Sequence, residues 1–325
     1  MAAPSRPQPP FALTVSAEAR AVMAPLLKQG SPPEMTATLL RNPITRKAIR
    51  LAAANHLKPL NKGRAKRFDV EVSKDRIAGV PVKWVLRRGT STASDHPLLI
   101  NFHGGGFSVD SGSLTETIPI AGLTGIPVVT VMYRMAPEHP FPAAVDDALV
   151  VYRAALADRP ARAIAIYGTS AGAVLTLQLL ARIKAEGLPM PACGGFFSGS
   201  GDLSQATDCE AFLPSVMGER AAFESLEHYV GKADPKDPLV SPVYGDLTGL
   251  PPIMAMTSTR DQLLSTTVLA DLALRKAGVE VDLRVYEGMM HAFWAWIECP
   301  ETDHALAAQA EFFSKHLAAS DGARG

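Results

Sequence analysis

From about residue 60 onward, short apolar runs rich in β-branched residues alternate with longer helical patterns. This alternation is typical of a largely parallel sheet covered by helices on both faces. Continuously apolar runs such as Leu98-Leu99-Ile100 predict central strands that are buried on both faces. We therefore expect an α/β fold, with eight strands over residues 68–73, 80–86, 98–102, 127–133, 163–167, 193–198, 252–257 and 281–286.

Two regions do not follow this alternation. Residues 1–60 carry two helical patterns, at 16–28 and 44–57, and residues 199–240 form a long insertion rich in Met, Phe and Leu. Long irregular segments in compact domains are usually functional or disordered, and the apolar residues in these two need cover. We expect them to form a helical cap on an α/β unit of residues 61–325. The alternative is a loose tail and a surface loop. The remaining helical patterns cover 143–156, 171–186, 263–277 and 302–317.

Composition excludes several classes of protein. The 325 residues contain 32 basic and 32 acidic side chains, so no excess charge attracts nucleic acid or an anionic membrane. The three cysteines have no disulfide-framework or metal-ligand spacing, and no basic segment followed by an apolar run begins the chain. We expect a cytoplasmic protein without a metal. Residues 163–181 carry no charge, but the glycines at 168 and 172 favour a strand, a turn and a helix over a membrane span.

The segment Gly168-Thr169-Ser170-Ala171-Gly172 lies between a predicted strand and a predicted helix. A G-x-S-x-G turn in this context holds its serine in a strained conformation with the hydroxyl exposed at the sheet edge. A glycine-rich turn with a helix-capping serine is the alternative interpretation. The strand before the turn and the helix after it favour a nucleophilic Ser170.

A second glycine cluster, Gly104-Gly105-Gly106, follows His103 directly after the predicted strand 98–102. Successive glycines let backbone N–H groups approach a ligand closely. The cluster matches neither a Walker loop nor the dinucleotide fingerprint, so oxyanion stabilisation is the chemistry that remains. We expect the oxyanion site to be formed by this glycine loop together with the N–H of Ala171.

A nucleophilic serine needs a base and an orienting carboxylate. Among the eight histidines, His291 is the strongest candidate, because its loop follows the last predicted strand. Asp261 follows the strand before it, with Asp246 and Glu287 as competing acids. The chain order Ser170, Asp261, His291 is the order of nucleophile, acid and base in α/β-hydrolases.

The chain resembles the bacterial hormone-sensitive lipase family (family IV) of α/β-hydrolase carboxylesterases, in the subgroup with threonine at position 169. The matching segments are HGGGF at 103–107, YRMAPEHPFPA at 133–143, GTSAG at 168–172, PLVSP at 238–242, LPP at 250–252 and GMMHAF at 288–293. The resemblance implies an eight-stranded α/β-hydrolase fold and a catalytic domain over residues 61–325. It also suggests that Arg134 pairs with Glu138 beneath the glycine loop.

The resemblance further implies a serine carboxylesterase that acts on small, uncharged esters with short to medium acyl chains, without a cofactor. Lactone hydrolysis with the same residues is an alternative, and a homodimer is a further expectation. The family also contains hormone receptors that do not turn over their ligand, but these lack the histidine that is present here as His291. Candidates for the substrate pocket are Phe107, Phe212, Leu213, Met217, Met290, Phe293 and Trp294.

Overall fold

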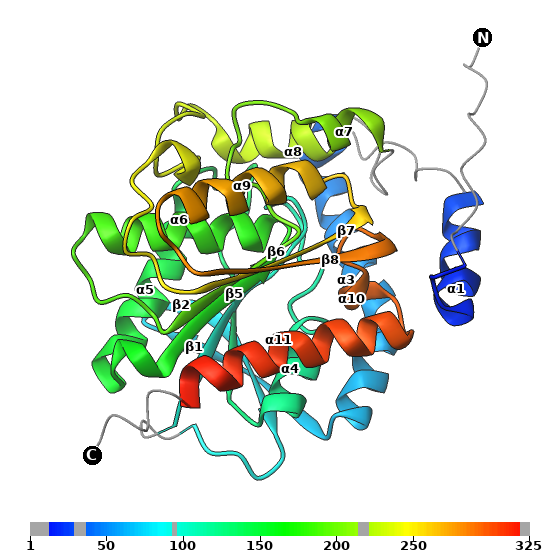
Figure 1. Cartoon of the computed structure of the whole chain (residues 1–325), viewed down its shortest axis with the longest axis horizontal. Helices are drawn as coiled ribbons and strands as arrows, with labels where there is room; N and C mark the ends of the chain where they lie inside the picture. The colour runs from blue at the N-terminus through cyan, green and yellow to red at the C-terminus, as the bar shows by residue number, and fades with distance from the viewer. Residues whose placement is uncertain (1–12, 29–36, 93–95, 214–220, 319–325) are drawn as a thin grey trace.

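The chain folds around one eight-stranded sheet, seen in a computed structural model that describes residues 13–28, 37–92, 96–213 and 221–318 (Figure 1). The sheet order is β1-β2-β4-β3-β5-β6-β7-β8. Strand β2 is antiparallel to both of its neighbours, and the strands from β4 to β8 run parallel to one another. The predicted fold class and all eight predicted strands are confirmed. Their bounds are β1 (Val70–Ile77), β2 (Val80–Arg87), β3 (Leu98–Phe102), β4 (Val128–Val131), β5 (Ile164–Thr169), β6 (Cys193–Phe197), β7 (Ile253–Arg260) and β8 (Val281–Met290).

Helices cover both faces of the sheet. Helices α5, α6 and α9 pack on one face, and α4 and α11 pack on the other (Figure 1). The central strands are buried on both sides because alternate residues of β3, such as Ile100 and Leu99, enter the cores on opposite faces. The described helices are α1 (Ala17–Lys28), α2 (Ala37–Arg41), α3 (Pro43–Arg67), α4 (Thr117–Thr124), α5 (Ala143–Asp158), α6 (Ala171–Ala185), α7 (Asp208–Phe212), α8 (Ala221–Val230), α9 (Leu264–Lys276), α10 (Phe293–Trp296) and α11 (Pro300–Ala318).

Three parallel strands end immediately before a predicted functional residue. Strand β5 ends at the residue before Ser170, β7 at the residue before Asp261 and β8 at the residue before His291. Strands β7 and β8 run further than the sequence predicts. Their last residues still pair with each other beyond a bulge between Ser258 and Arg260. The carboxyl ends of parallel strands lie at one edge of a sheet, so this topology brings the three side chains to the same edge.

The uncharged segment 163–181 forms β5, a turn and the first part of α6, as predicted. Among the described residues, no helix has both the length and the apolar character needed to cross a membrane.

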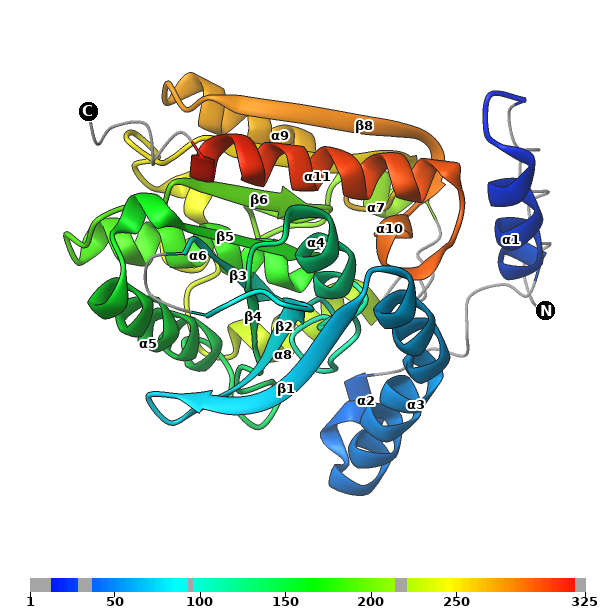
Figure 2. The same cartoon turned by 90° about the horizontal axis from the view of Figure 1, so that it is seen from below.

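The helices before the first strand do not pack as one group. Helix α2 contacts α8 of the 199–240 insertion. Helix α1 instead packs beside α11, where the hydroxyl of Ser16 donates a hydrogen bond to Glu301 over 2.7 Å (Figure 2). The division into a cap and a catalytic domain therefore stays a prediction.

Helix α3 is longer than predicted, because it continues past Pro59 and Gly63 to Arg67. The long-range contacts of Arg64 hold the last turns of α3 in place. The guanidinium of Arg64 is 2% exposed; it pairs with Glu298 over 2.6 Å and donates hydrogen bonds to the carbonyl oxygens of Thr115 and Trp294. This one side chain therefore joins α3 to the segment before α4 and to the segment after β8.

We predict that Arg64→Ala lowers the free energy of unfolding by about 3–5 kcal/mol, because it leaves two carbonyl oxygens without their buried donor. Urea denaturation measures the loss. Arg67→Ala is the matched control: this neighbouring arginine also pairs with Glu298 but is 46% exposed, so we expect a loss below about 1 kcal/mol. Equal losses in the two variants would contradict this account of Arg64.

Candidate active site

Ser170 lies in a sharp turn between β5 and α6. Its backbone has φ 58° and ψ −121°, a strained conformation for a residue with a side chain. The turn fits only because two flanking residues lack a Cβ. A Cβ at Gly172 would lie 1.8 Å from the carbonyl oxygen of Phe102, and one at Gly168 would lie 2.3 Å from the Gly172 carbonyl carbon. The Ser170 N–H donates to the carbonyl oxygen of Phe197 over 2.8 Å, which ties the turn to β6.

The glycine loop that follows β3 lies directly against this turn. A Cβ at Gly104 would be 3.4 Å from the Cβ of Ser170. Gly105 and Gly106 have φ values of 115° and 56°, which glycine adopts without strain. Among the described residues, none accepts a hydrogen bond from the N–H of Gly105, Gly106 or Ala171. The N–H of Gly104 instead donates to Glu116 Oε1 over 3.4 Å, so the other three amides fit the oxyanion role better than Gly104 does.

His291 and Asp261 are hydrogen-bonded partners. The distance from His291 Nδ1 to Asp261 Oδ1 is 2.8 Å, which matches the tautomer that carries its proton on Nδ1. The competing acids lie elsewhere: Asp246 binds Lys184 at the surface over 2.6 Å, and Glu287 is exposed. The structure therefore brings together the histidine and the acid that the sequence favours.

Asp261 is fully buried and is held by several donors besides His291. The hydroxyls of Ser198 and Thr257 and the N–H of Leu263 all donate to its carboxylate. Burial alone would raise the pKa of Asp261, but the charge and hydrogen bond of His291, with the bonds from Ser198 and Leu263, hold this pKa below its ordinary value. Asp261 is therefore an ionised acceptor for His291 at neutral pH.

Ser198 is a functional candidate that the sequence analysis did not find. It follows the end of β6 and has φ 50°, so a strained backbone aims its hydroxyl at Asp261. The available signal was its position after a buried strand next to the one that carries Ser170. The local sequence, a serine followed by glycine, does not indicate that its partner is Asp261, 63 residues later.

His103 makes buried structural contacts. The buried ring stacks on Tyr133 with centroids 4.2 Å apart, and the hydroxyl of Tyr133 donates to the His103 carbonyl oxygen over 2.7 Å. The expected pair of Arg134 with Glu138 is wrong. Arg134 binds Asp147, while Glu138 accepts two hydrogen bonds from Arg50 of α3. Arginines of helix α3, and not Arg134 of the local loop, therefore pair with Glu138.

The predicted pocket residues have different environments. Phe107, Phe293 and Trp294 are fully buried; Phe107 stacks on Tyr229 with centroids 3.4 Å apart, and Trp294 donates to Thr169 Oγ1 over 3.3 Å. Their burial favours a core role. Met290 is largely buried and Leu213 is half-buried, whereas Met217 and the side chain of Phe212 lie outside the described residues. A place in the substrate pocket stays a prediction for these residues.

A surface pocket beside α8 includes none of these candidates. It is lined by Arg41, Leu203, Leu226, His228 and their neighbours. Among the described residues, no group of three or more His, Cys, Asp or Glu side chains is arranged to hold a metal ion.

The similar proteins share an α/β-hydrolase fold, and relatives among them are named as an acetyl-hydrolase and an esterase. Residues 99–295 match the model of an α/β-hydrolase-fold family. An acetyl-hydrolase of Streptomyces hygroscopicus is 31% identical over 72% of this chain and 83% of its own length. An esterase of Acinetobacter venetianus is 32% identical over 75% of this chain and 82% of its own length.

Solved structures extend the likeness to nearly the whole chain. The crystal structure of an esterase matches with a TM-score of 0.82 and 31% identity, over 96% of this chain and 98% of its own. An esterase of the bacterial hormone-sensitive lipase family matches with a TM-score of 0.79 and 29% identity, over 93% of this chain and 99% of its own.

We predict that Ser198→Ala slows the labelling of Ser170 by an organophosphate about tenfold, because Asp261 loses a charge-assisted hydrogen bond worth about 1.5–3 kcal/mol. Intact-mass spectrometry at timed intervals measures the labelling rate. Ser73→Ala, on the exposed face of β1, is the control and should label like the wild type. An unchanged rate in Ser198→Ala would mean that this hydroxyl does not support the acid.

Proposed function

The chain belongs to the bacterial hormone-sensitive lipase family of α/β-hydrolase-fold carboxylic ester hydrolases, and we propose that Ser170, His291 and Asp261 carry its chemistry. The observation that carries the proposal is the placement of these side chains. Each directly follows a parallel strand of the same sheet, and His291 is hydrogen-bonded to a buried, ionised Asp261. This is the arrangement that activates a serine for attack on a carbonyl carbon.

The proposed reaction has two steps. In the first step the Ser170 oxygen attacks the ester carbonyl carbon, and His291 Nε2 takes the serine proton and passes it to the departing alcohol. This step forms a bond from serine oxygen to acyl carbon and breaks the bond from that carbon to the alcohol oxygen. In the second step water attacks the acyl-serine with the same base, releases the carboxylic acid and restores Ser170.

Asp261 and the glycine loop have separate tasks in both steps. Asp261 keeps the Nδ1 proton of His291 in place and stabilises the imidazolium that forms when Nε2 accepts a proton. The N–H groups of Gly105, Gly106 and Ala171 stabilise the negative oxygen of the tetrahedral intermediate. The loop and the turn lie close together, since even a Cβ added to Gly104 would come within 3.4 Å of the Ser170 Cβ.

For the substrate we propose an uncharged ester with a short to medium acyl chain. Relatives named acetyl-hydrolase support the short end of this range, as does an ethyl acetate hydrolase of Pseudomonas putida that is 30% identical over 67% of this chain and 73% of its own length.

We predict that His291→Asn lowers kcat for p-nitrophenyl acetate by about a thousandfold or more, because the serine loses its base. Ser170→Ala should lower kcat by at least as much, and an organophosphate should no longer label the protein. His139→Asn is the matched control, since this histidine is exposed and should leave kcat unchanged. Circular dichroism verifies that each variant is folded. Substantial turnover by folded Ser170→Ala would refute the assignment.

We predict that kcat/KM across a p-nitrophenyl ester series is highest from acetate to hexanoate and falls about tenfold or more by dodecanoate, because a closed pocket stops gaining contacts once it is filled. Small lactones assayed at matched concentrations test the alternative substrate class. Rates that keep rising to the longest chain would contradict the proposed acyl range, and lactone opening faster than acetate hydrolysis would favour a lactonase.

A further inference from the structure

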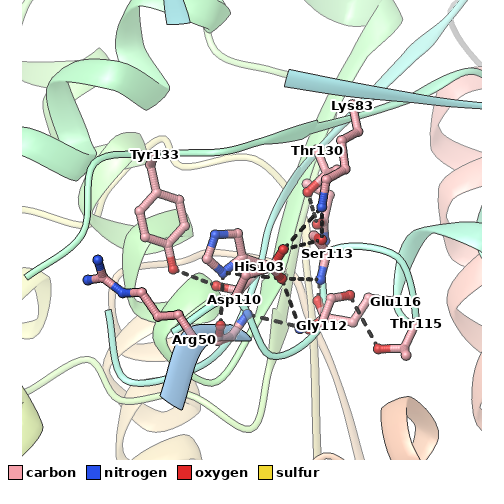
Figure 3. A network of polar contacts seen from close by, with 12 residues as sticks. Arg50, Lys83, His103, Asp110, Gly112, Ser113, Thr115, Glu116, Thr130 and Tyr133 are labelled. Carbon is pink, nitrogen blue, oxygen red and sulfur yellow. Dashed lines mark hydrogen bonds and ion pairs between the residues drawn. The ribbon is translucent and has the colours of Figure 1, made fainter. Parts of the chain in front are cut away.

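Glu116 is a buried carboxyl group behind the glycine loop, and the proposed mechanism does not use it. It lies just before α4, is 3% exposed and is close to Gly112 (Figure 3). Its Oε1 accepts the N–H of Gly104 over 3.4 Å, and its Oε2 accepts a hydrogen bond from Asn101 Nδ2 over 3.3 Å. The side chain of Thr169, which precedes Ser170, is a further hydrogen-bonding neighbour.

The surroundings of Glu116 are shaped to hold its carboxyl group. A Cβ at Gly112 would lie 1.9 Å from Glu116 Oε1, so any other residue at 112 would collide with the carboxyl group where it now sits. The amide of Asn101 is oriented by Thr130, whose hydroxyl donates to Asn101 Oδ1 over 2.9 Å. The donor end of Asn101 therefore faces Glu116. Burying a carboxyl group costs free energy, and here matched hydrogen-bond partners offset part of that cost.

The contacts of Glu116 connect the two halves of the oxyanion site. Gly104 belongs to the glycine loop, and Thr169 is the last residue of β5, directly before Ser170. We propose that Glu116 is a positioning residue that fixes the glycine loop against the nucleophile turn, so that the N–H groups of Gly105, Gly106 and Ala171 point at one oxygen. The inference rests on the proposed function, because it assigns Glu116 a part in stabilising the oxyanion of that reaction.

The charge state of Glu116 gives the proposal a distinctive consequence. Burial raises the pKa of Glu116 to about 8, although hydrogen bonds from Asn101, Gly104 and Thr169 partly counter this effect. At pH 7 the carboxyl group is therefore mostly uncharged. Once ionised, it would place a negative charge behind the developing oxyanion and oppose it in a medium of low dielectric constant. Turnover should therefore fall as the pH rises through about 8.

The other titratable groups around Glu116 do not change their charge over this range. Burial alone would raise the pKa of Asp110, but neighbouring charges and hydrogen bonds, including those of Lys83 on β2 and Ser113, hold it well below the usual range, so Asp110 stays ionised. Burial keeps the pKa of His103 low and raises the pKa values of Tyr133 and Tyr167 well above 10. From α3, Arg64 reaches the carbonyl oxygen of Thr115 and stays charged. Glu116 is thus the group in this described cluster that titrates near pH 8.

The test compares kcat and KM for p-nitrophenyl butyrate between pH 6 and 9.5 in the wild type, Glu116→Ala and Glu116→Gln. Glu116→Ala removes the carboxyl group that accepts hydrogen bonds from Gly104 and Asn101. It should lower kcat about tenfold or more at pH 7, with KM within about twofold. Glu116→Gln is always neutral and keeps one acceptor oxygen for Gly104 or Asn101, so its kcat should lie between those of the wild type and Glu116→Ala. The wild-type kcat should decline above pH 8, whereas that of Glu116→Gln should stay level. Glu186→Gln, at the surface end of α6, is the matched control.

Thermal unfolding verifies that the variants are folded, and the conservative Glu116→Gln keeps the test valid if Glu116→Ala is unstable. A wild-type kcat in Glu116→Ala, or a loss confined to KM, would overturn the positioning role. The same alkaline decline in Glu116→Gln as in the wild type would also overturn it, because the decline would then belong to another group. Failure of the proposed function would look different, since the wild type itself would then show no turnover beyond that of Ser170→Ala.

Discussion

The site depends on one close approach between backbones. Helix α6 begins so near the end of β3 that the carbonyl oxygen of Phe102 occupies the place where a side chain at Gly172 would start. This contact forces the chain to turn sharply at Ser170 and accounts for the left-handed φ of that residue. It also sets the distance between the nucleophile and the glycine loop, because β3 leads directly into Gly104. Oxyanion donors and nucleophile are therefore positioned by the same packing constraint.

Local sequence patterns predicted the sheet well because each strand carries its own signal. The apolar runs and the glycines at both turns are short-range features, and the chain order of Ser170, Asp261 and His291 needed only the positions of the strands. The lengths of β7 and β8 were underestimated, because the residues near their ends, such as Ser258 and Glu287, are polar. Their extension depends on pairing between the two strands, which a single strand's pattern does not reveal.

The residues that sequence reasoning missed are those whose roles come from distant partners. Ser198 gains its role from Asp261, and Glu116 gains its role from Gly104, Asn101 and Thr169. The wrong pairing of Arg134 with Glu138 has the same cause, because Glu138 pairs with Arg50, 88 residues earlier, and with Arg46. No pattern in the neighbouring sequence distinguishes these polar residues from ordinary surface or capping residues.

The contact of Ser16 with Glu301 joins residues 285 positions apart, and Arg64 reaches Trp294 in the same way. A ribosome makes Ser16 and Arg64 long before Glu301 and Trp294. Helix α1 and the end of α3 therefore cannot complete these contacts until the residues that follow β8 have been made. The bond from Arg64 to α10, which follows His291, can form only at that stage.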